Sequence, residues 1–112
     1  SNSLYKPEII EDIRFFRAEE VAAMKLNAVC IRGSKKDFFD IYELLNNFSL
    51  KQLFTFYTKK YDNKDIAMVL RALTYYKDAE AQPDPISLNK TKWVVVKKEI
   101  SKQVKDFFLN KL

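Results

Sequence analysis

Four charged side chains lie close together between residues 25 and 40 and could act on a phosphate. Lys25 and Arg32 are seven residues apart, which places both cations on one face of a helix. Asp37 and Asp40 are three residues apart and share a face of the next helix. A cation offsets the charge of a phosphate, while a carboxylate orients or deprotonates a hydroxyl. Two cations and two carboxylates across one groove would therefore suit a phosphate site.

The same four residues also have plain structural interpretations. Asp37 follows Ser34 by three residues, which is the spacing of a capping box at the start of a helix. Asp40 could form a surface ion pair with Lys36. The stem of Lys25 could lie along the edge of the core, and Arg32 could interact with the dipole at the end of its helix. The residues alone leave both interpretations open.

The elements that position these residues are expected to be helices. The chain has 112 residues but one glycine and three prolines, too few turn residues for a hairpin-rich β fold. From Ala18 the apolar residues recur with a helical period, and Gly33 is expected to end that helix as its C-cap. The apolar stripe predicted for this first helix consists of Val21, Met24, Ala28 and Ile31.

Four more helices are predicted after Gly33. The expected N-caps are Ser34, Ser49, Asn63 and Thr91, the first two with capping-box partners at Asp37 and Gln52. The polar segment 77–90 contains two prolines and is predicted to be a loop. The last helix is expected to continue to Leu112.

A short strand is predicted ahead of the helices, in the β-branched and aromatic run Ile13–Phe16. The chain offers this strand no partner, so its sheet is expected to lie outside the chain. We therefore predict a mainly α fold, a bundle of about five helices over residues 17–112 preceded by a lead-in, residues 1–16, with one short N-terminal strand. The initial Ser-Asn-Ser, residues 1–3, lacks a methionine and is expected to be an expression scar.

Composition excludes several classes of function. Histidine is absent, which removes the commonest general base and metal ligand, and the single cysteine, Cys30, excludes a disulfide framework and a cysteine-based zinc site. No apolar run approaches the ~18 residues of a membrane span and no signal peptide is recognisable, so we expect a cytoplasmic protein without a membrane partner. The net charge of +5 favours acidic partners such as nucleic acids or nucleotides, although solubility explains it nearly as well.

The segments around the four charges resemble the second half of nucleotidyltransferase toxins of the AbiEii/AbiGii type. That family pattern is a lysine-centred helix, then an arginine or lysine with an aspartate, two residues, a second aspartate and an apolar pair. The resemblance covers most of the chain from Ile13 onward, and the segments that carry it are 19–28, 32–45, 70–80 and 83–85.

The resemblance implies the helical C-terminal part of a polymerase-β-like nucleotidyltransferase fold, in a toxin of an abortive-infection or toxin–antitoxin pair. It implies Mg²⁺ and a nucleoside triphosphate as cofactors of the intact enzyme, a cognate antitoxin as a partner and tRNA as an RNA substrate. By this resemblance, Lys25 and Arg32 would bind the nucleotide, while Asp37 and Asp40 would be the acidic catalytic residues.

One family motif is absent from this chain. Family members carry a Gly-Ser followed by paired aspartates on a strand, whereas Gly33-Ser34 is followed by lysines and falls in a helical turn. Without those carboxylates the metal clamp for in-line transfer is incomplete. The 112-residue chain alone is therefore expected to bind no cofactor, to be inactive and to need a missing N-terminal portion. The alternative is a stand-alone helical interaction module that binds an antitoxin or nucleic acid without catalysis.

Overall fold

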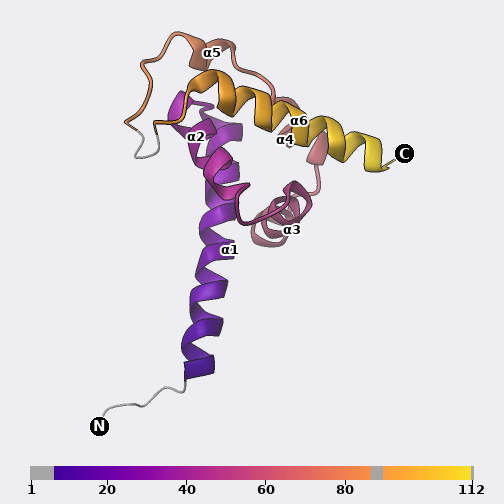
Figure 1. Ribbon diagram of the computed structural model, residues 1–112. Helices are drawn as coiled ribbons and strands as arrows, with labels where there is room; N and C mark the ends of the chain where they lie inside the picture. The colour runs from indigo at the N-terminus through magenta and orange to yellow at the C-terminus, as the bar shows by residue number, and fades with distance from the viewer. Residues whose placement is uncertain (1–6, 87–89, 112) are drawn as a thin grey trace.

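The computed structural model describes residues 7–86 and 90–111, and all regular secondary structure in these ranges is helical (Figure 1). The helices are α1 (Pro7–Ile31), α2 (Lys35–Leu44), α3 (Leu50–Tyr61), α4 (Ile66–Leu73), α5 (Lys77–Glu80) and α6 (Trp93–Lys111). Five of them have eight residues or more, and α5 is a single turn. The predicted mainly α bundle of about five helices is thus confirmed.

The short strand predicted at Ile13–Phe16 is wrong, because these residues lie inside α1. The helix begins at Pro7, where a proline loses no hydrogen bond since the first N–H groups of a helix have no partner within it. Glu8 lies in the first turn, next to the positive end of the helix dipole. Ile9, Ile13 and Phe16 then follow at helical spacing, and this period outweighs the β propensity of the individual residues.

Helix α1 carries apolar side chains on two opposite faces. Ala22, Leu26 and Val29 are buried and pack into the core. Val21, Met24 and Ile31, which belong to the apolar stripe predicted for this helix, are 45%, 54% and 76% exposed, so that prediction is wrong. At about 100° per residue, the two sets lie on opposite sides of the helix. We call the exposed set the outer stripe, and it consists of Ile9, Ile10, Ile13, Phe16, Val21, Met24 and Ile31.

Only the C-terminal half of α1 packs against the rest of the protein. All side chains described between Glu8 and Ala18 are exposed, and the helix extends from the body as a rod (Figure 1). The radius of gyration is 15.8 Å, against about 13 Å for a compact domain of this length. The expected boundary between residues 16 and 17 is crossed by α1 without interruption.

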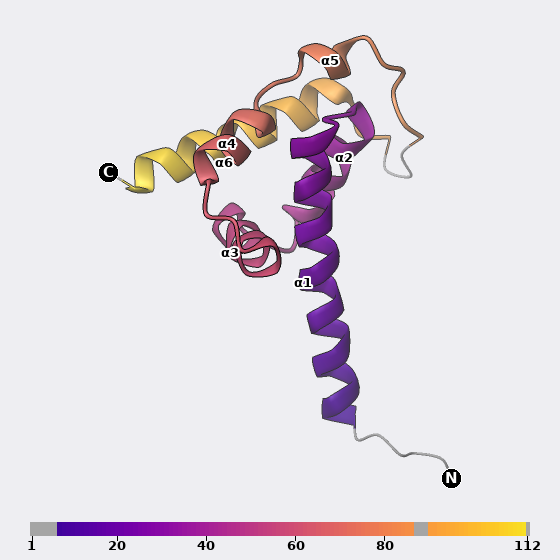
Figure 2. The ribbon, with the colours of Figure 1, turned by 180° about the vertical axis from the view of Figure 1, so that it is seen from behind.

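The body consists of α2, α3, α4 and α6 packed around the C-terminal half of α1. Helix α6 crosses α2, α3 and α4, and α4 runs beside it when the protein is seen from behind (Figure 2). The largest fully buried side chains come from all five long helices and include Leu26, Phe38, Leu53, Tyr57, Leu73 and Ile100. This core holds the C-terminal half of α1 against the other long helices.

Local signals place most helix ends where the sequence predicts them. Both capping boxes are present, at Ser34 with Asp37 and at Ser49 with Gln52. Gly33 has a φ of +54°, and a Cβ there would lie 3.3 Å from the carbonyl oxygen of Val29. Glycine is therefore required to end α1 and turn the chain directly into α2.

The first helix begins at Pro7 and not at Ala18, and the predicted starts of α4 and α6 and the predicted loop between them also need correction. The N-cap of α4 is Asp65 and not Asn63, whose side chain instead accepts a hydrogen bond from the backbone N–H of Asp65 at 2.9 Å. The loop predicted over 77–90 contains the single turn α5, and α6 begins at Trp93, two residues after Thr91. Short polar segments offer several possible caps, and the tertiary packing selects among them.

The two faces of α1 predict opposite responses to mutation. Leu26→Ala should lower the free energy of unfolding by about 2–5 kcal/mol because it leaves a cavity in the core. Met24→Ala, two residues away on the outer stripe, should change it by less than about 1 kcal/mol. Urea unfolding of both variants measures the difference, and a larger loss for Met24→Ala would contradict the assignment of the faces.

Candidate functional site between α1 and α2

The structure brings the four predicted site residues together as two neighbouring ion pairs. Lys25 Nζ lies 3.2 Å from Asp40 Oδ2, and an Arg32 guanidinium nitrogen lies 2.8 Å from Asp37 Oδ1. The pKa of Arg32 is raised, mainly by its hydrogen bonds to Asp37 and also by the charge of Asp40. The two ion pairs both join α1 to α2, and we refer to them together as the charge cluster of the α1–α2 junction.

Both carboxylate oxygens of Asp37 accept hydrogen bonds from nearby residues. It is 2% exposed and accepts hydrogen bonds from Nε and a terminal nitrogen of Arg32 at 2.8 to 3.1 Å. It also accepts from the backbone N–H and the hydroxyl of Ser34, at 2.9 and 2.7 Å. A carboxylate has about four lone-pair sites, and these bonds occupy them. Asp37 therefore joins the end of α1 to the start of α2 and has little capacity left for a substrate.

The environment of Asp37 favours its charged form. Burial alone would raise the pKa of this carboxyl, but the hydrogen bonds from Arg32 and Ser34, together with the charge of Arg32, outweigh burial and hold the pKa below its usual value. The carboxylate therefore stays ionised at neutral pH, which does not suit a general acid.

The carboxylate of the Lys25–Asp40 pair is more exposed to solvent than the carboxylate of the Arg32–Asp37 pair. The side chains of Lys25 and Asp40 are 37% and 29% exposed, and within the described residues neither makes another ion pair. Each group consequently keeps hydrogen-bonding capacity that faces solvent. Of the two carboxylates in the cluster, Asp40 is the one that a ligand could reach.

The described residues contain no group of three or more His, Cys, Asp or Glu side chains that could hold a metal ion. Both carboxylates of the cluster already face cations, which compete with any metal. The cluster therefore does not fit the Mg²⁺ that the family resemblance implies. Among the same residues, no helix is long and apolar enough to cross a membrane.

Arg32 also borders a cavity of about 370 Å³ at the C-terminal ends of α1 and α4. Arg71, Tyr75 and Asp78 line it, together with Cys30, whose pKa is raised by burial. Two arginines would attract a phosphate, but the cavity faces the negative ends of two helix dipoles and includes a carboxylate. These negative charges offset the arginines, so the cavity is a poor phosphate site.

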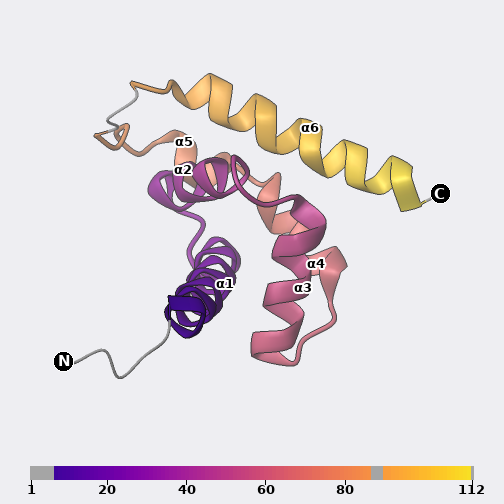
Figure 3. The ribbon, with the colours of Figure 1, turned by 60° about the horizontal axis from the view of Figure 1, so that its bottom comes forward.

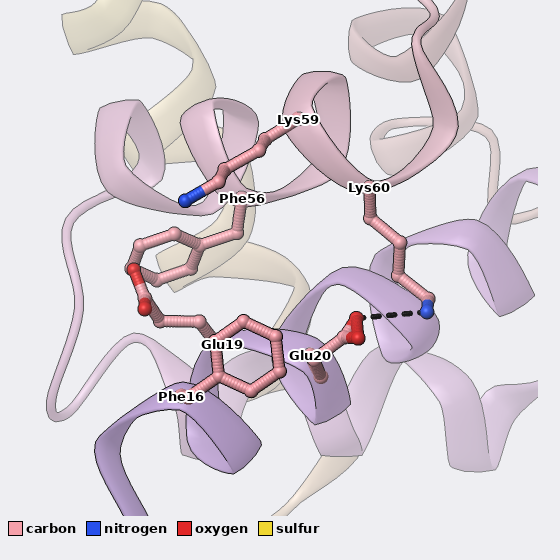
Figure 4. Close-up of a pocket in the computed structure, with 6 residues that line it drawn as sticks. All are labelled: Phe16, Glu19, Glu20, Phe56, Lys59 and Lys60. Carbon is pink, nitrogen blue, oxygen red and sulfur yellow. Dashed lines mark hydrogen bonds and ion pairs between the residues drawn. The ribbon is translucent and has the colours of Figure 1, made fainter. Parts of the chain in front are cut away.

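A second cavity, of about 240 Å³, lies where α1 leaves the body and faces α3 (Figure 4). The rings of Phe16 and Phe56 line it, and Lys60 Nζ lies 2.8 Å from Glu20 Oε2 at its side. The remaining charges, Glu19 and Lys59, have opposite signs. The cavity is thus aromatic and balanced in charge, which suits an apolar side chain better than a phosphate.

One buried cation is not predicted by the sequence. Lys35 is 5% exposed, its Nζ lies 2.9 Å from Asp84 Oδ1 and 5.3 Å from the centre of the Trp93 ring, and its backbone N–H donates to Gln82 at 2.6 Å. Glu80 meanwhile accepts from the Trp93 indole N–H and pairs with Lys97. These contacts hold residues 80–84 against α2 and α6. The hydrogen bonds of Lys35 join residues 47 and 49 positions apart, so a local sequence pattern could not have predicted them.

Comparisons with known proteins identify no family. No family model and no solved structure matches the chain. The chain is similar to an uncharacterized protein of Aquifex aeolicus (strain VF5), with 37% identity over 83 residues that are 70% of this chain and 40% of that relative. The chain therefore spans about two fifths of the length of the relative. None of these comparisons tests the resemblance to nucleotidyltransferase toxins, which stays a prediction.

The geometry of Asp37 predicts that even a conservative change is costly. Asp37→Asn places an amide nitrogen among donors from Arg32 and Ser34, so the free energy of unfolding should fall by about 2 kcal/mol at neutral pH. Asp40→Asn, in a more exposed pair, should cost less than about 1 kcal/mol. Chemical unfolding at pH 7 compares the two variants.

The same experiment repeated in acid isolates the charge of Asp37. Its pKa is lower in the folded than in the unfolded protein, so its stabilising effect is present above the unfolded pKa and is lost as the pH falls through the folded pKa. The stability difference between the unmodified protein and Asp37→Asn should therefore narrow below about pH 4. A difference that stays constant down to pH 2 would contradict a role for the charge.

Proposed function

We propose that this chain is the helical part of a two-part nucleotidyltransferase-type protein and that it contributes the Lys25–Asp40 pair to the nucleotide site. The observation that carries this proposal is the pair itself, a cation 3.2 Å from a carboxylate across two helices, with both side chains partly exposed. Lys25 would offset the charge of a triphosphate, and Asp40 would orient or deprotonate the acceptor hydroxyl.

The other charged pair would position the first. Arg32 and Asp37 connect the end of α1 to the start of α2, and this connection sets the distance between Lys25 on one helix and Asp40 on the other. In this proposal Asp37 is a positioning residue and Asp40 is the acidic catalytic residue. Arg32 keeps a side chain that is 68% exposed and would offer its free donors to the nucleotide.

The remaining parts of the site would belong to a second portion of the protein. The described residues offer no cluster of carboxylates for Mg²⁺, so the metal and the paired aspartates would be held by a catalytic sheet in the missing N-terminal portion. The length of the Aquifex relative supports this division, because 60% of it extends beyond the segment similar to this chain. A cognate antitoxin and tRNA are the partners that the family resemblance suggests for the whole protein.

The alternative function, an interaction module without catalysis, has one observation in its favour. The outer stripe of α1 exposes large apolar side chains along the helix, which is the usual mark of a protein interface. The two functions are separable, because an interaction module needs the stripe but does not need Lys25 or Asp40.

Nucleotide-transfer rates of the longer protein, with variants of the pair, test the proposal. Asp40→Asn should lower turnover by a factor on the order of 10² or more, while Lys25→Met should weaken triphosphate binding because its cation is lost. Lys60→Met is the matched control, since Lys60 forms a similar interhelical pair with Glu20 on the other side of α1. It should leave both turnover and binding unchanged.

The 112-residue chain by itself should transfer no nucleotide, because it lacks the metal-binding carboxylates. Transfer by this chain, lost in Lys25→Met, would overturn the two-part arrangement. Normal turnover of Asp40→Asn in the longer protein would remove the acidic role of Asp40 and leave the interaction module as the better explanation.

A further inference from the structure

The outer stripe places seven exposed apolar side chains along the length of α1, and the charged residues Arg17 and Glu20 lie among them. Its seven side chains are between 39% and 76% exposed, and at about 100° per residue they fall within an arc of roughly 140°. They leave on the order of 600 Å² of apolar surface, the upper end of what a monomer usually exposes in one patch. An exposed apolar surface of this size and shape is typical of a protein interface.

The body of the protein leaves this surface open. Viewed close to the axis of α1, helices α2 and α3 both lie to one side of it (Figure 3). The buried residues Ala22, Leu26 and Val29 face these helices, and the outer stripe faces away from them except at Phe16, whose ring borders the cavity against Phe56 of α3. A further helix can therefore lie against α1 along its full length.

We propose that the outer stripe is covered by the outer stripe of a second copy of this chain, with the two α1 helices antiparallel. A two-fold interface requires a surface that is complementary to itself. About a centre near Val21, antiparallel pairing places Ile10 opposite Ile31 and Ile13 opposite Ala28. Apolar positions then meet apolar positions at both ends of the interface, and the two-fold axis passes between Glu20 and Val21, so the two copies of Val21 lie next to each other.

The position of Arg17 selects the antiparallel direction. Arg17 lies within the arc of the stripe, and it makes no ion pair within the described part of the chain. Parallel pairing would place Arg17 directly against the same residue of the second copy, two like charges at the centre of an apolar interface. Antiparallel pairing places it opposite Met24, where its stem packs and its guanidinium reaches solvent. Antiparallel helix dipoles also attract each other.

The interface accounts for the projecting half of α1. In the antiparallel dimer, residues 8–18 of one copy lie along the packed half of α1 in the other copy. The buried surface, on the order of 600 Å² from the stripe plus the flanking residues, approaches the ~800 Å² per partner of a standard interface. This inference is independent of the proposed function, since it involves neither Lys25 nor Asp40.

Sedimentation equilibrium of the 112-residue chain tests the proposal. The chain should have about twice its monomer mass of 13.2 kDa. Val21→Asp should make it monomeric, because two carboxylates would meet at the two-fold axis. Val94→Asp is the matched control, since Val94 is 62% exposed on α6 and away from α1. It should remain dimeric, and circular dichroism should show both variants folded.

Disulfide cross-linking tests the direction of the helices in a Cys30→Ala background, which removes the native thiol. Val21→Cys should form a covalent dimer on mild oxidation. Ile10→Cys should cross-link poorly with itself but readily with Ile31→Cys when the two variants are mixed. Efficient self-cross-linking of Ile10→Cys would indicate parallel helices and overturn the antiparallel arrangement.

Two further results would overturn the proposal as a whole. A chain that stays monomeric up to about 1 mM would mean that the outer stripe serves a different polypeptide. A dimer that persists unchanged in Val21→Asp would place the interface on another surface. In both cases nucleotide transfer by the longer protein would still test the Lys25–Asp40 pair separately.

Discussion

The buried carboxylate of Asp37 controls how the first two helices meet. A charge that is 2% exposed is stable only if its hydrogen bonds replace those of water, and here Arg32 and Ser34 supply them. Arg32 comes from the end of α1 and Ser34 from the cap of α2, so one side chain joins the two helices. Gly33 allows the sharp turn between them because its φ is positive. The charge cluster exists because this junction has a fixed geometry.

The same junction explains why similar charges have different roles. Asp37 and Asp40 lie on the same face of α2, but the capping position draws Asp37 into the turn, while Asp40 faces Lys25 one helical turn further along. Hydrogen bonding therefore separates a carboxylate that supports the fold from one that stays accessible. Chemical type and spacing do not distinguish the two, but the number of occupied lone pairs does.

Helix α1 has a different relation to the fold, because it belongs to the core on one face only. Its C-terminal half lies against α2, α3 and α4, whereas the described side chains of its N-terminal half are exposed, and Phe16 borders the cavity that faces α3. A helix with apolar residues on two opposite faces is satisfied only when both faces are covered. The fold of this chain covers one of them and leaves the outer stripe exposed, which is the basis of the proposed dimer.

Local signals in the sequence were sufficient for the helical fold and most of its boundaries. The capping boxes at Ser34 and Ser49 and the glycine at position 33 act through hydrogen bonds and sterics within a few residues, which a sequence displays directly. The spacing of Lys25, Arg32, Asp37 and Asp40 likewise placed these charges at one junction. The strand at Ile13–Phe16 was wrong because residue propensity is weaker than the helical period around it.

Tertiary structure decided what each helical face contacts. Val21 and Met24 have the same period as Leu26 and Val29, and only the position of α2 and α3 determines which set is buried. Lys35 is held by Asp84 and Trp93, and Lys60 is held by Glu20, all of which lie far away along the chain. Burial and ion pairing depend on groups brought together from distant positions, and a local pattern contains no information about their distance in space.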